Sequence, residues 1–145
     1  MVDELSVADN VRLYGAVCRI RRATIRQRFD AILDWAGLAP YRDAELRTLS
    51  TGMRTRLAFA IAMHIDSDLL CMDEAFSAGD KRFQGKCDDW FREGKSSGRT
   101  ILVATHNLDF VRDFCDRTLW LHDGQQMAFG PTESVLPRYI RFCAQ

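Results

Sequence analysis

The sequence lacks a long apolar run and a leader-like amino terminus. No apolar stretch approaches the roughly 18 residues that are needed to cross a bilayer. The opening residues, MVDELSVADN, do not show the basic-then-apolar order of a signal peptide. We therefore expect a soluble chain, or part of one, in the cytoplasm.

Cysteine pairs with metal-ligand spacing are also missing. The chain has five cysteines, an odd number, and no two of them form a C-x-x-C pair. Neither a disulfide framework nor a zinc site is indicated, and the compartment is expected to be reducing. The cysteines are Cys18, Cys71, Cys87, Cys115 and Cys143.

No excess of charge is present, because 20 basic residues balance 20 acidic ones. A global field that recruits nucleic acid or an acidic membrane is thereby excluded. One local basic run has no interleaved aromatic residues, and we interpret it as the solvated face of a helix. It comprises Arg19, Arg21, Arg22, Arg26 and Arg28. No nucleic-acid partner is expected.

The first third of the chain has helical spacing. Four apolar residues fall at i, i+3, i+4 and i+7, and a glycine follows as a stop signal. They are Phe29, Ile32, Leu33 and Ala36, followed by Gly37. A shorter helix is predicted over 7–17, with one face formed by Val11, Tyr14 and Val17, and a loop is expected around Pro40.

The remainder of the chain alternates between strand-like and helix-like segments. Residues 68–72, 100–105 and 117–121 are short and mostly apolar without alternation, as in strands covered on both faces. Helical segments over about 79–93 and 107–115 separate them. This order predicts a parallel α/β sheet.

Polar residues directly follow two of these strands. Ligands of open α/β sheets bind beyond the carboxyl ends of the strands, where Asp73, Glu74 and His106 are placed. Alone, the histidine can be a hydrogen-bonded structural residue and the carboxylates can cap the next turn. Together they form a constellation suited to metal-assisted phosphoryl or water chemistry.

Four motifs in this order resemble those of the nucleotide-binding subunits of ABC transporters. Residues 49–53 (LSTGM) resemble the signature sequence, and 69–74 (LLCMDE) resemble Walker B with its catalytic glutamate. Residues 77–80 (SAGD) are similar to the D-loop, and 105–107 (THN) to the switch-histidine loop. Thr51 and Met53 depart from the usual Leu-Ser-Gly-Gly-Gln pattern. The residues in and around these motifs are most similar to those of ATPases that export O-antigen, capsule or teichoic-acid polymers.

The resemblance implies an incomplete P-loop NTPase, or RecA-like, α/β fold: a parallel sheet with helices, preceded by an α-helical subdomain. Residues 1–65 would form the helical subdomain with the signature, and 66–145 the part of the core with Walker B, D-loop and switch histidine. The chain would begin just after the Gln loop of a nucleotide-binding domain.

The same resemblance assigns roles to the strand-end residues. Asp73 would hold Mg²⁺ through water, and Glu74 would orient and deprotonate the attacking water. His106 would contact the γ-phosphate. Phosphoryl transfer depends mainly on such positioning and charge neutralisation.

The signature residues are expected to act on a nucleotide held by a second subunit. Ser50, Thr51 and Gly52 begin a helix, and a helix N-terminus offers unpaired N–H groups to an anion. Asp80 would meet the facing subunit. The structural alternative is that Ser50 is only an N-cap and Gly52 only a turn residue.

The phosphate loop Gly-x-x-x-x-Gly-Lys-Ser/Thr does not occur in these 145 residues. The triplet 94–96 (GKS) has the right ending, but position 89 is Asp and the stretch follows a helical segment instead of a strand. We therefore expect no useful ATP affinity or hydrolysis from the chain alone.

The sequence as a whole predicts the ATP-binding and ATP-hydrolysing component of an ABC transporter for polysaccharide export. ATP and Mg²⁺ are the implied cofactors in the complete assembly. The implied partners are a second nucleotide-binding subunit, head to tail, and a transmembrane permease at the inner face of the plasma membrane. The alternative is a catalytically silent regulatory module derived from such an ATPase.

Overall fold

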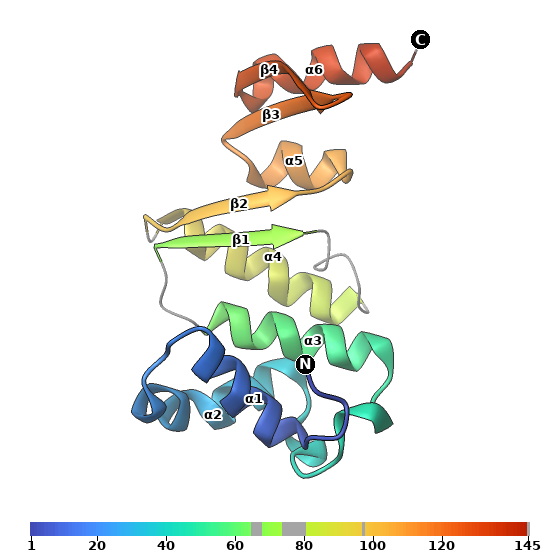
Figure 1. Cartoon of the computed structure of the whole chain (residues 1–145). Coiled ribbons are helices and arrows are strands. Elements are labelled where there is room, and N and C mark those ends of the chain that lie inside the picture. The colour runs from blue at the N-terminus through green and yellow to red at the C-terminus, as the bar shows by residue number, and fades with distance from the viewer. Residues whose placement is uncertain (65–67, 74–80, 97, 145) are drawn as a thin grey trace. The chain divides into compact units, whose positions relative to one another are not determined.

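The computed structural model describes residues 1–64, 68–73, 81–96 and 98–144. The chain divides into two compact units, Met1–Leu102 and Val103–Gln145. Figure 1 shows the order of the elements along the chain. The predicted subdomain boundary near residue 65 stays a prediction.

The first unit opens with the helices that the sequence predicts. They are α1 (Val7–Val17), α2 (Arg22–Ala36) and α3 (Thr51–Met63), with short 3₁₀ turns η1 (Ala39–Tyr41) and η2 (Leu46–Thr48). Gly37 ends α2 in the left-handed region at φ 69°, which confirms it as the stop. The shared face predicted for α1 is wrong at Val17, which is 71% exposed. Gly15 is buried there instead.

The core of these helices is a single apolar cluster. The stripe predicted on α2 is confirmed, because Ile32, Leu33 and Ala36 are almost fully buried and Phe29 is 6% exposed. Val7, Ala8 and Val11 of α1 and Leu57, Ala60 and Ile61 of α3 belong to the same cluster. The helical region therefore has a continuous core of its own.

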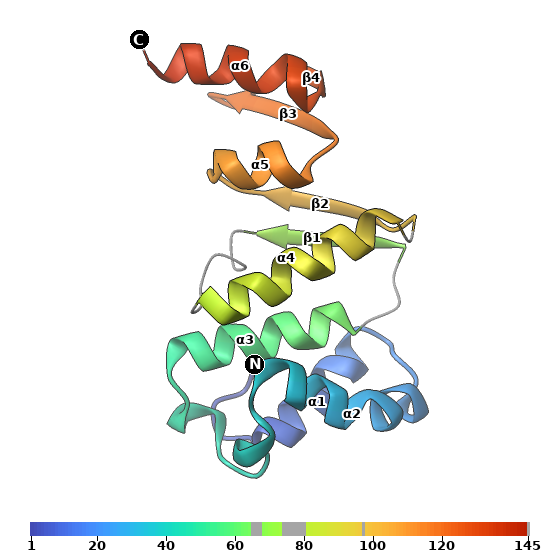
Figure 2. The same cartoon turned by 180° about the vertical axis from the view of Figure 1, so that it is seen from behind.

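The strands of the first sheet are β1 (Leu69–Asp73) and β2 (Thr100–Ala104), joined through α4 (Lys81–Ser96). The two arrows run in the same direction in Figure 1, and the parallel pair is confirmed. Figure 2 shows α4 crossing one side of β1. The end of α4 lies close to β2, since a Cβ on Gly94 would lie 3.4 Å from the Ile101 side chain.

The burial of β1 and β2 differs from the expectation of strands covered on both faces. Half-buried residues alternate with exposed ones along both strands, and Leu69 and Leu102 are 54% and 60% exposed. The apolar run without alternation reflects residue type, whereas the structure covers only the face toward α4.

The second unit contains α5 (Leu108–Phe114), β3 (Arg117–His122), β4 (Gln125–Pro131) and α6 (Thr132–Cys143). The third predicted strand pairs antiparallel with β4 in a sheet of its own, instead of extending the parallel pair. The prediction missed β4. Its signal was Asp123-Gly124, which have φ 49° and 73° and make the tight hairpin turn. Trp120 packs between the hairpin and α6, against Tyr139 and Phe142.

Candidate functional site

The signature residues form the amino-terminal end of α3. Ser50 is the N-cap: its Oγ accepts a hydrogen bond from the backbone N–H of Met53 at 3.3 Å, and its carbonyl accepts from Arg54. Thr51 and Gly52 are the first two helical residues. Their N–H groups lie in the first turn, where no intrahelical acceptor exists, so they point beyond the helix end. Ser50 and Thr51 are exposed.

Packing within the chain does not explain the glycine in this turn. A Cβ on Gly52 would find no atom within 4 Å, and its φ is not positive. In contrast, a Cβ on Gly15 would collide with Ile25 at 2.5 Å. Open space above the backbone at Gly52 leaves room for a group from outside the chain to approach closely.

Arg54 fixes the signature turn to the start of the chain. Its guanidinium pairs with the Asp3 carboxylate at 2.9 Å and donates to the Leu49 carbonyl at 3.3 Å. The structure shows Arg54 in an intrachain ion pair that positions the turn.

Asn10 is a positioning residue that the sequence reasoning missed. It is fully buried, its Oδ1 accepts from the Val2 N–H at 2.8 Å, and its Nδ2 donates toward the carbonyls of Val2, Leu5 and Ser6. It thereby holds the segment that carries Asp3. A polar residue among the apolar positions of α1 was the available signal, because buried polar groups are almost always hydrogen-bonded.

Asp73 is the last residue of β1, and its side chain is exposed. A single carboxylate fits Mg²⁺, which keeps several waters and takes one or two protein carboxylates. Among the described residues no group of three or more metal-ligating side chains is found. Glu74, Asp80 and the rest of the predicted D-loop lie outside the described residues.

His106 follows β2 on a turn that its neighbours hold in place. The Thr105 hydroxyl accepts from the Asn107 N–H at 3.0 Å. Asn107 is the N-cap of α5, and its Oδ1 accepts from the Phe110 N–H at 3.0 Å. The side chains of both polar neighbours thus accept hydrogen bonds from the backbone, and the imidazole of His106 is exposed. Asp73 is the last residue of β1, and His106 lies two residues after the carboxyl end of β2, the other strand of the same sheet.

A search of the described helices finds none that is long and apolar enough to span a bilayer.

The comparisons with known proteins agree with this arrangement. A family model described as "ABC transporter" matches residues 1–77. The teichoic acids export ATP-binding protein TagH of Bacillus anthracis is 37% identical over 139 residues, which are 96% of this chain and 25% of that protein. The corresponding protein of Lactiplantibacillus plantarum is 39% identical over 134 residues, 92% of this chain and 37% of its own length.

Solved structures show the same fold. The ATP-binding subunit of an ABC transporter has a TM-score of 0.84 at 23% identity, covering 96% of this chain and 58% of that one. An ATP-binding cassette in a dimeric post-hydrolysis state with ADP and Pi has a TM-score of 0.74 at 22% identity, covering 91% of this chain and 59% of its own.

The chain spans only a quarter to two fifths of the length of the curated relatives. Within that span the motif order, the partial RecA-like fold and the identity to the export proteins agree. The chain belongs to the ABC transporter family, as a carboxyl-terminal portion of an ATP-binding domain related to those of teichoic-acid export.

Proposed function

We propose that this chain supplies the signature, Walker B and switch-histidine part of an ATPase that powers polymer export. The observation that carries the proposal is the identity to teichoic acids export ATP-binding proteins along nearly the whole chain. The position of Asp73 at the carboxyl end of β1 and that of His106 just after β2 support it.

In the proposed reaction water attacks the γ-phosphorus of ATP, and the bond to the β,γ-bridging oxygen breaks. Glu74 accepts the proton of that water. Asp73 would hold Mg²⁺ through water, and the ion would supply charge neutralisation to the phosphates when bound. His106 contacts the γ-phosphate from its turn after β2. ADP and inorganic phosphate are the products.

The phosphate loop that this reaction needs is not found in the 145 residues. We propose that the chain by itself neither binds ATP with useful affinity nor hydrolyses it. Saturable micromolar ATP binding by the purified chain, measured by calorimetry, would contradict this statement.

The signature turn is proposed to act on the nucleotide of a second subunit in a head-to-tail dimer. The open N–H groups of Thr51 and Gly52 and the space above Gly52 support an external anion there. Asp80 would lie at the same subunit interface.

The proposed partners are this second subunit and a transmembrane permease, which would hold the protein at the inner face of the plasma membrane. The proposed cargo is a cell-surface polysaccharide of the teichoic-acid or O-antigen type. The support is the description of the relatives as export proteins.

A second candidate is a catalytically silent module that keeps the signature and partner surfaces. The departure of Thr51 and Met53 from the usual signature pattern favours it. A chimaera separates the two candidates: the matched segment of the Lactiplantibacillus plantarum relative is replaced by this chain, so that the host supplies everything outside that segment.

An active ATPase portion predicts turnover by the chimaera within about tenfold of the host protein, and loss of about 100-fold or more for Glu74→Gln with ATP binding retained. Glu4→Gln, an exposed change, is the matched control. A folded, ATP-binding chimaera without turnover would support the silent module. Unchanged turnover for Glu74→Gln would show that Glu74 is not the general base.

Ser50 allows a finer test in the same chimaera. Ser50→Ala removes only the cap and is expected to cost about 1 kcal/mol of stability. Ser50→Arg also fills the space at the turn, so ATP-dependent dimerisation should fail for Arg and persist for Ala. Equal dimerisation by both variants would leave Ser50 as a cap only.

A further inference from the structure

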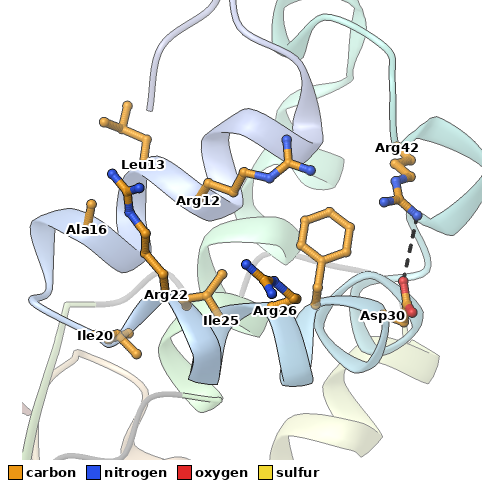
Figure 3. A pocket seen from close by; sticks show the side chains of 10 residues that line it. Arg12, Leu13, Ala16, Ile20, Arg22, Ile25, Arg26, Asp30 and Arg42 are labelled. Atoms are coloured by element: carbon orange, nitrogen blue, oxygen red, sulfur yellow. Dashed lines mark ion pairs between the residues drawn. The ribbon is translucent and has the colours of Figure 1, made fainter.

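A surface pocket of about 590 Å³ lies between α1 and α2 of the first unit, and none of its lining residues belongs to the motifs. Figure 3 shows four arginine side chains around it. Arg12 comes from α1, Arg22 and Arg26 from α2, and Arg42 from the residue after η1. The volume lies in the range of sites that bind ligands or anchor side chains.

The floor of the pocket is apolar and rigidly packed. Phe29 and Ile25 are 6% and 8% exposed and belong to the core cluster, and Ile20 packs against it. Leu13 and Ala16 of α1 complete the apolar lining. An aliphatic side chain from outside would therefore bury its surface against Leu13, Ala16 and Ile20, above this packed base.

The arginines fall into two pairs. Arg12 and Arg42 lie over the ring of Phe29, with guanidinium carbons 5.4 and 4.8 Å from its centroid. Each also meets a carboxylate: Arg12 is 2.7 Å from Asp9, and Arg42 is 3.8 Å from Asp30.

Arg22 and Arg26 differ from that pair. Both are exposed, and no hydrogen bond or ion pair to either is found within the described part of the chain. Four arginines and one carboxylate, Asp30, leave the lining with a net charge of +3, and the Asp9 carboxylate beside Arg12 lowers the local charge to +2. The two uncommitted guanidinium groups are therefore available to an anionic partner, in bidentate geometry if the anion is a carboxylate.

We propose that this pocket docks an acidic peptide segment of a partner protein, with an aliphatic side chain on the apolar floor and flanking carboxylates on Arg22 and Arg26. The positive charge of the lining favours an acidic partner, and the recessed apolar floor favours a protruding aliphatic side chain. The inference is independent of nucleotide binding, because it uses none of the motif residues.

Two other anionic partners fit the pocket less well. A nucleic acid would need open aromatic faces for its bases, but the ring of Phe29 is covered by Arg12 and Arg42. A membrane surface is broad, whereas the floor is recessed between two helices and takes a protruding group.

The test uses the full chain and a fluorescein-labelled synthetic peptide with central leucines flanked by aspartates and glutamates. Its matched control peptide carries asparagines and glutamines instead. Fluorescence polarisation should show saturable binding of the acidic peptide, at least about tenfold weaker binding of the amide peptide, and a similar loss for Arg22→Gln/Arg26→Gln.

The control protein is Arg82→Gln/Arg138→Gln, which removes two exposed arginines on α4 and α6 and should bind like the parent. Equal loss in the control would show general electrostatics and overturn the proposal, as would no saturable binding at all. Binding of phosphatidylserine vesicles or single-stranded RNA that Arg22→Gln/Arg26→Gln abolishes, without acidic-peptide binding, would also overturn it.

Discussion

The helical region, residues 1–64, and the strand region, the described residues from 68 to 144, differ in how they bury apolar surface. The main core cluster runs from Val7 to Ile61 and so lies wholly in the helical region. Large exposed apolar side chains gather in the strand region. They include Leu69, Leu102, Leu119, Leu121, Met127 and Phe129.

The difference shows which region offers apolar surface to a partner, namely the strand region. Three helices that face one another can satisfy an amphipathic pattern locally, but a two-stranded sheet covered by one helix keeps an apolar face toward solvent. In the hairpin, Leu119 pairs with Phe129 across the strands, so both lie on one face. Trp120 lies on the other face, with α6. Such apolar faces typically mark interaction surfaces.

The largest effect is expected where the helical region relies on one buried polar group. Asn10→Ala removes all four hydrogen bonds that hold residues 2–6 and should lower the free energy of unfolding by about 3 kcal/mol. Urea unfolding followed by circular dichroism measures it. Gln27→Ala, an exposed change on α2, should stay within about 0.5 kcal/mol. Equal values for the two would show that Asn10 does not hold the region together.

A slightly smaller effect is expected at the closest approach of α1 and α2. Gly15→Ala places a Cβ 2.5 Å from Ile25 Cγ1, so it should destabilise the chain by about 2 kcal/mol. Gly85→Ala, where the Cβ meets open space on α4, should instead stabilise by about 0.5–1 kcal/mol. A shift of the melting temperature in the same direction for both variants would show that the contact between α1 and α2 is not tight.

The apolar face of the hairpin should act on association more than on folding. We expect the chain to self-associate, and Leu119→Gln/Phe129→Gln to weaken association about tenfold in sedimentation with little change in the thermal melt. Val17→Gln is the matched control, since Val17 is the isolated exposed residue at the end of α1. A parent chain that stays monomeric would contradict the prediction.

The fold could be predicted where the signal is local. Helical spacing and Gly37 defined α2, and the apolar runs located β1 and β2 within a residue of their observed bounds. The pairing of β3 depended on a non-local choice that periodicity does not encode, and the Asp123-Gly124 turn was the overlooked cue. Val17 was misplaced because α1 turns a different residue, Gly15, toward α2.

The site could be predicted as a set of positions but not as a set of contacts. Motif order gave Ser50, Gly52, Asp73 and His106, and the structure places each at a helix or strand end. The role of Arg54 in pairing with Asp3 depends on contact across about fifty residues of chain, which a single sequence does not reveal.

The smallest effect concerns Cys87 on α4, the helix between β1 and β2 in the strand region. Burial, with a smaller contribution from the nearby Asp88 charge, raises the pKa of the Cys87 thiol to about 12. A raised pKa favours the neutral thiol, so its contribution to stability is complete below the ordinary value of 9.0 and is lost as the pH rises from there toward about 12. The free energy of unfolding of Cys87→Ser should therefore fall less than that of the parent chain between pH 9.0 and about 12.

Thiol alkylation separates Cys87 from the exposed Cys18, Cys71 and Cys143. At pH 8 iodoacetamide should modify these three first and reach Cys87 only when α4 opens, because both thiolate formation and access are suppressed by burial. Mass spectrometry of the modified peptides against time measures the order. α4 contacts the helical region through Phe83 and Phe91, which pack on Phe59, so slow labelling of Cys87 would show that α4 shares the stability of the helices. Labelling of Cys87 as fast as Cys71 would instead show that α4 opens independently of the helical region.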